Sequence, residues 1–70
     1  MTKRSLTIAG HRTSISLEDT FWDALAEIAT ARRVSIAALV AEIDRGRPQA
    51  ANLSAAVRIA VLDWYRAGSR

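Results

Sequence analysis

The side chains best suited to chemistry in this chain alternate along one short segment, RTSISL at residues 12–17. Arg12, Ser14 and Ser16 occupy every second position, the period of a β-strand, and therefore share one face. The chemistry open to guanidinium and hydroxyl groups in this arrangement is hydrogen bonding. A two-stranded β-ribbon with small polar and basic side chains on its outer face fits the major groove of DNA.

Catalysis and metal binding have little support in the sequence. The chain has no cysteine and a single histidine, His11, which argues against the usual zinc sites, thiol catalysis and redox chemistry. His11 lies at an expected turn, where a general base has neither an orienting partner nor a pocket. Glu18, Asp19, Asp23 and Glu27 follow the preference of acids for a helix start. We therefore expect no enzyme activity, no metal and no cofactor.

A lone strand followed by helices is the architecture that the spacing predicts. Phe21, Leu25 and Ile28 follow residue 17 at the i, i+4, i+7 spacing of a helix. A lone strand cannot satisfy its own backbone N–H and C=O groups, and the same strand of a second copy is the obvious partner. We predict a mainly α fold, with one N-terminal strand paired across a homodimer and three α-helices after it.

The chain is short enough to be a single domain over residues 1–70. Its predicted segments are a basic arm or hairpin at 1–11, a strand at 12–17, helices at 18–32, 35–44 and 53–67, and a linker at 45–52. Ser16 with Asp19 fits a capping box for the first helix, Ser35 is the expected N-cap of the second, and Asn52 or Ser54 caps the third.

The N-terminal segment allows two interpretations. It is either a flexible basic arm or a second strand, in which a type II′ turn at Gly10-His11 would bring Leu6 opposite Ile15. We favour the arm, because a hairpin would widen the ribbon and hinder its entry into a groove.

Positive charge is concentrated in two places along the chain. The net charge is +3 with a pI near 10.6, and the first seventeen residues contain bases but no acid. Arg32 and Arg33 lie together where the first helix ends, as its dipole favours. The dipole does not explain the acid-free start, which favours a nucleic-acid partner.

The sequence also bears on location and assembly. Its longest uncharged apolar run is too short to cross a bilayer, and the N-terminus lacks the features of a signal peptide, so we expect a soluble cytoplasmic protein. Half of the residues are hydrophobic in a chain that can bury little alone, which favours dimerisation.

Residues 12–43, RTSISLEDTFWDALAEIATARRVSIAALVAEI, resemble the Arc/MetJ/CopG-type ribbon-helix-helix family of DNA-binding proteins. The likeness is in the order of a polar-faced strand, an acidic helix start, an apolar helix, a brief turn and a Ser-capped second helix. The segments GHRTSISLE and NLSAAVRIAVL look like a subgroup of short bacterial proteins with an added C-terminal helix. The resemblance implies a homodimeric regulator of transcription, a bacterial-type repressor, that inserts an intermolecular β-ribbon into the major groove of double-stranded DNA.

The resemblance also implies roles for individual residues. Arg12, Ser14 and Ser16 match the positions that reach base edges, with helix capping as the alternative for Ser16. Ser35 and Ile36 match the start of the second helix, where free N–H groups can hold a phosphate. Further phosphate contacts are expected from Lys3, Arg4, Arg32 and Arg33.

The apolar residues are expected to form the core and the dimer contacts. They are Ile15, Leu17, Phe21, Trp22, Leu25, Ile28, Leu39, Val40, Ile43, Val57, Val61 and Trp64. So broad an apolar surface on the third helix supports an alternative function: a dimeric protein-interaction module, such as an antitoxin-like or phage-like adaptor, that captures another protein. The two functions are compatible, and exposure of Val57, Val61 and Trp64 in the free dimer would favour the alternative.

Overall fold

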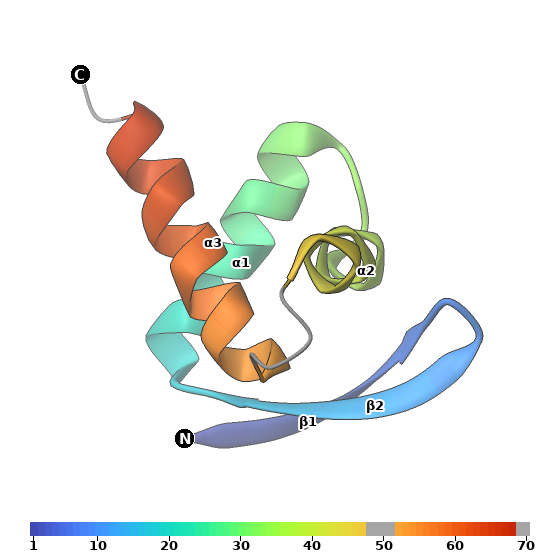
Figure 1. Ribbon diagram of the computed structural model, residues 1–70. Helices are drawn as coiled ribbons and strands as arrows, with labels where there is room; N and C mark the ends of the chain where they lie inside the picture. Colours follow the sequence, from blue (N-terminus) through green and yellow to red (C-terminus); the bar gives the residue numbers. More distant parts are fainter. Residues whose placement is uncertain (48–51, 69–70) are drawn as a thin grey trace.

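The computed structural model describes residues 1–47 and 52–68, which form a two-stranded hairpin and three helices (Figure 1). The elements are β1 (Thr2–Ile8), β2 (His11–Leu17), α1 (Asp19–Arg32), α2 (Ile36–Gly46) and α3 (Leu53–Gly68). The hairpin curves beneath the helices, and α3 leads away from it toward the C-terminus. Of the predicted linker, residues 48–51 lie outside the described residues, and α2 continues through its first two positions.

The N-terminal segment is a strand, so the prediction of a single strand and our preference for an arm were wrong. β1 pairs antiparallel with β2, from Thr2 opposite Leu17 to Ile8 opposite His11. The alternative interpretation, a hairpin within one chain, is confirmed. Its register differs from the expected one, because Arg4 and not Leu6 lies opposite Ile15. One edge of β2 is thus satisfied within the chain, and the hairpin is only as wide as the two-stranded ribbon that we expected from two chains.

The hairpin turn explains the register. Ala9 and Gly10 form the turn, with φ angles of 51° and 82°, the pattern of a type I′ turn. Glycine adopts a positive φ without steric cost, whereas the Cβ of Ala9 makes the left-handed conformation unfavourable. The turn lies one residue earlier than we predicted, because the two positive φ angles fall on Ala9 and Gly10.

Replacement of Ala9 by asparagine should therefore stabilise the protein. We expect Ala9→Asn to raise the free energy of unfolding by about 0.5–1 kcal/mol, because asparagine tolerates positive φ and Asn-Gly is a favoured type I′ pair. Urea denaturation followed by circular dichroism measures the change. In the control, Ala31→Asn at an exposed position of α1, the stability should fall, since asparagine is a poorer helix former. A loss of stability in Ala9→Asn would contradict the type I′ assignment.

Side-chain caps begin two of the helices. The Ser35 hydroxyl accepts a hydrogen bond from the Ala38 N–H at 3.0 Å, and the Asn52 side-chain oxygen accepts one from the Ala55 N–H at 2.8 Å. These bonds satisfy backbone donors that a helix start leaves free. They confirm Ser35 as the cap of α2, and they identify Asn52, of the two candidates, as the cap of α3.

The first helix begins differently from the prediction. Glu18 occupies the N-cap position and makes no side-chain cap hydrogen bond. Ser16 is two residues earlier, within β2 and opposite Lys3. The predicted capping box was therefore wrong, because the strand continues to Leu17 and leaves no room for a Ser16 cap.

Glu18 instead joins the start of α1 to α3. Its carboxylate Oε1 lies 3.0 Å from Nε of Arg58. The pKa of Glu18 is lowered from its usual 4.5, first by a hydrogen bond from its own backbone N–H and then by the hydrogen bond from Arg58. A carboxyl with a lowered folded-state pKa stabilises the fold above its unfolded-state pKa, and this stabilisation is lost as the pH falls through the folded value.

We therefore expect Glu18→Gln to reduce the acid sensitivity of the fold. Below its usual pKa of 4.5, the wild-type protein loses the contribution of the ionised carboxylate, whereas the glutamine variant has none to lose. Melting temperatures measured from neutral pH down through this range should fall less steeply for the variant. Arg58→Met should show part of the same effect, because Arg58 is only the second cause of the shift. Parallel curves for wild type and Glu18→Gln would contradict this assignment.

One hydrophobic core lies between the inner face of the hairpin and the three helices. Its fully buried side chains come from β2 and from each helix: Ile15, Leu17, Leu25, Val40 and Val57. Trp22, Ile28, Leu39 and Val61 are also buried, and Ile8 adds the end of β1. Of the other expected core or dimer residues, Phe21 and Ile43 are half-buried against this core, whereas Trp64 is 40% exposed.

Candidate nucleic-acid interface

The hairpin presents one polar face away from the helices. Directly paired residues share a face of a sheet, and Ile15 and Leu17 mark the inner one. The pairs on the opposite side are Lys3 with Ser16, Ser5 with Ser14, and Thr7 with Arg12. We call these residues the outer face. Lys3 and Arg12 are its cations, every other member carries a hydroxyl, and all are exposed except the half-buried Ser16.

The outer face brings together the residues predicted to contact bases. Arg12, Ser14 and Ser16 follow one another along it, and Lys3 is beside Ser16. Ser5 and Thr7 belong to the same surface and were not predicted. The signal that could have found them is the period of two in β1, which we assigned to an arm.

Arg4 does not belong to the outer face, although it was an expected phosphate contact. It lies on the opposite side of β1, where its guanidinium carbon is 5.1 Å from the centre of the Trp22 ring in a cation–π contact. The Trp22 indole N–H also donates a hydrogen bond to the backbone oxygen of Thr2 at 3.2 Å. Arg4 and Trp22 thus attach β1 to α1.

The expected phosphate contacts at the junction of α1 and α2 are separate from the outer face. The end of α1 lies far from the hairpin (Figure 1). Arg32 forms an ion pair with Glu42 of α2, and Arg33 ends α1 in the left-handed conformation with φ 58°. The Ser35 hydroxyl is engaged by its own helix, and Ile36 is half-buried. The structure therefore does not bring this group together with Arg12.

Another basic residue lies beside the hairpin turn and was not predicted. Arg47, which follows α2, lines a shallow hollow with His11 and Arg12. Asp44 lines the same hollow, and its Oδ1 lies 2.6 Å from Nε of Arg47. Only the tertiary fold brings Arg47 to the strands, so no local pattern could have indicated it.

Two further findings concern other kinds of site. Within residues 1–47 and 52–68, no cluster of His, Cys, Asp and Glu side chains could hold a metal ion. Among the helices of that same part of the chain, none is long and apolar enough to cross a membrane.

A two-stranded β-ribbon with a cationic, hydroxyl-rich outer face, supported by a small helical core, defines a protein of the β-ribbon nucleic-acid-binding class. The chain belongs to the ribbon-helix-helix domain family, whose model matches residues 1–65. This match confirms the resemblance, and it covers β1 and most of α3 as well as residues 12–43. Proteins of the family are DNA-binding regulators that form dimers. Comparison with curated proteins and with solved structures finds no match.

Proposed function

We propose that the protein is a homodimeric DNA-binding regulator of transcription that sets the outer face of its hairpin into the major groove. The observation that supports this proposal is the composition of that face, which has two cations, hydroxyl groups and no acid. The major groove is about 12 Å wide and admits a two-stranded ribbon. In this proposal each ribbon comes from one chain, in contrast to the intermolecular ribbon that we predicted.

The positions on the outer face support a division of roles. Arg12 can bond the two acceptors of a guanine edge, whereas the paired hydroxyls of Ser5 and Ser14 discriminate less between bases. Lys3 and Arg12 belong to pairs four residues apart along the strands, a separation of about 13 Å at the rise of a β-strand. Lys3 can therefore hold a phosphate while Arg12 contacts a base. With one arginine on this face, we expect modest sequence specificity.

Selection of bound duplexes from a random library tests the proposal. We expect the wild-type protein to enrich a palindromic motif, since a symmetric dimer contacts two half-sites. Affinity should fall by orders of magnitude between about 50 and 200 mM salt if the dimer contacts roughly six to ten phosphates. Binding without enrichment would instead support an architectural, non-specific role. Absence of duplex binding at low salt would contradict the proposal.

Exposed apolar side chains on α3 support the second candidate function, a protein-interaction module. Ile59 is 60% exposed and Leu62 53%, and the two lie one turn apart on the same side of the helix. Of the three residues that we predicted for this surface, Val57 and Val61 are buried in the protein's own core, whereas Trp64 is 40% exposed. In the first proposal, this exposed apolar surface of α3 contacts a second copy of the chain. In the alternative function, the same surface binds a different protein.

Leu62→Lys distinguishes these two occupants. We expect sedimentation to show a dimer for the wild type and a monomer for Leu62→Lys, because the substitution places an unpaired charge in the interface. Ala38→Lys, at an exposed position of α2, is the matched control and should remain dimeric. A wild type that is monomeric at all accessible concentrations would contradict a homodimer through α3 and favour capture of another protein.

A further inference from the structure

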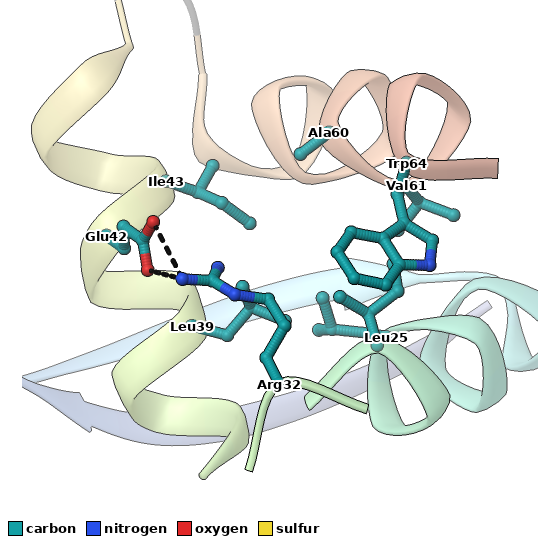
Figure 2. A pocket seen from close by; sticks show the side chains of 9 residues that line it. Leu25, Arg32, Leu39, Glu42, Ile43, Ala60, Val61 and Trp64 are labelled. Atoms are coloured by element: carbon teal, nitrogen blue, oxygen red, sulfur yellow. Dashed lines mark hydrogen bonds and ion pairs between the residues drawn. The ribbon is translucent and has the colours of Figure 1, made fainter. Parts of the chain in front are cut away.

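A pocket opens between the three helices, apart from the outer face (Figure 2). Its volume is about 190 Å³. Leu25 of α1, Leu39 of α2 and Val61 of α3 line it and are buried in the core. Ile43 of α2 and Ala60 of α3 also line it. The proposed DNA-binding function makes no use of this space.

A charged pair lies at the edge of the pocket. Nη2 of Arg32 is 2.9 Å from Oε2 of Glu42 and 3.1 Å from Oε1, and the two side chains meet across the gap between α1 and α2 (Figure 2). A guanidinium group has five N–H donors in a planar fork that matches a carboxylate. The contacts with Glu42 use only Nη2, so Arg32 retains donors for a second anion.

Trp64 forms the opposite wall. Its indole stands beside Leu25 and Val61 on the side of the pocket away from Glu42 (Figure 2). The side chain is 40% exposed, although tryptophan is among the most hydrophobic residues. A planar ring placed in the pocket would cover this exposed surface and could stack on the indole.

We propose that this pocket binds a small anion that joins one aromatic ring to a carboxylate. An apolar cavity of about 150 Å³ holds a benzene molecule, so a volume of 190 Å³ suits one ring with a short polar group. The ring lies among the apolar side chains and against Trp64, and the carboxylate bonds the donors of Arg32 that Glu42 does not use. The N–H donors of Arg32 that Glu42 leaves unused are the feature that selects a carboxylate over a neutral ring of the same size.

Titration with benzoate, followed by the NMR signals of the two tryptophan indole N–H groups, tests the proposal. We expect benzoate to shift the Trp64 signal in a saturable way. Trp22 lies on the hairpin side of the core and its signal serves as the internal reference. Benzyl alcohol has the ring without the charge and should bind at least about tenfold more weakly, as expected for loss of a charge-assisted hydrogen bond. Acetate has the charge without the ring and should cause no saturable shift.

Two variants separate specific binding from other causes. Ala60→Leu fills the pocket and should weaken benzoate binding by about tenfold or more, whereas Ala38→Leu on the exposed side of α2 should leave it unchanged. Arg32→Gln should make the affinities for benzoate and benzyl alcohol equal. An unchanged Trp22 signal and circular dichroism spectrum verify that each variant is folded.

Three results would overturn the proposal. One is the absence of a saturable Trp64 shift at millimolar benzoate. Another is a shift of the same affinity in Ala60→Leu. The third is a Trp64 signal that depends on protein concentration and is insensitive to benzoate, which would show that a second copy covers the pocket. None of these results bears on DNA binding by the outer face, so the two proposals fail independently.

Discussion

Replacement of Arg12 by alanine should weaken binding to the preferred duplex about 10- to 100-fold, because a bidentate arginine–guanine contact contributes about 1–3 kcal/mol of discrimination. Arg12 is exposed at the turn end of the outer face, opposite Thr7. Arg12 does not belong to the hydrophobic core, so the variant should remain folded. The library selection should lose its preference at one position of each half-site, which distinguishes loss of a base contact from loss of a phosphate contact.

Arg66→Ala is the matched control for this experiment. It removes the same charge from an exposed position near the end of α3, far from the hairpin in Figure 1. Fluorescence anisotropy at fixed ionic strength should show a much smaller loss for this variant, through the lowered net charge alone. Equal losses for Arg12→Ala and Arg66→Ala would reduce the role of Arg12 to general electrostatic attraction and contradict base recognition by the outer face.

Replacement of Leu25 by alanine should destabilise the fold more than any other change considered for this chain. Leu25 is fully buried at the meeting point of α1 with the rest of the core. Truncation of a buried leucine lowers the free energy of unfolding by about 2–5 kcal/mol, whereas a chain of 70 residues has roughly 4–10 kcal/mol in total. The lost volume adjoins the pocket between the helices, so the site cannot readily collapse, and we expect a value in the upper half of that range.

Urea denaturation of Leu25→Ala measures this loss. Thr30→Ala, an exposed change on the same helix, is the control and should alter the free energy of unfolding by no more than about 0.5 kcal/mol. A loss below about 1 kcal/mol for Leu25→Ala would contradict its place at the centre of the core. Both variants keep the outer face intact, so the residual folded fraction of each should bind DNA with wild-type affinity.

The sequence predicted the elements whose signals are local. The period of two at 12–17 corresponds to β2, and the switch to helical spacing after it corresponds to α1. Ser35 was predicted as a cap because an N-cap acts on its own next turn, and the bond to Ala38 is of that kind. The hydroxyl and guanidinium groups of β2 were placed on one face by alternation alone.

The sequence could not predict features that depend on contacts between elements. We predicted an arm in place of β1 because we expected a hairpin to be too wide for the groove of DNA. In addition, the Ala9-Gly10 turn lacks the asparagine that makes type I′ turns recognisable in a sequence. Arg4 could be separated from Lys3 only once residues 2–8 were known to form a strand, in which neighbouring side chains point to opposite faces. The pairing of Arg32 with Glu42 requires knowledge of how α1 meets α2.

The origin of both ribbon strands in one chain has a consequence for how occupancy of a DNA site depends on protein abundance. A ribbon assembled from two chains exists only after they associate, so at low abundance its amount follows the square of the protein concentration. Here β1 and β2 are adjacent in one chain, and every protomer has a complete ribbon. Binding to a single half-site would then rise in direct proportion to concentration. Dimerisation would determine the spacing between two half-sites and the cooperativity of binding to them. It would have no part in forming the outer face that contacts each half-site.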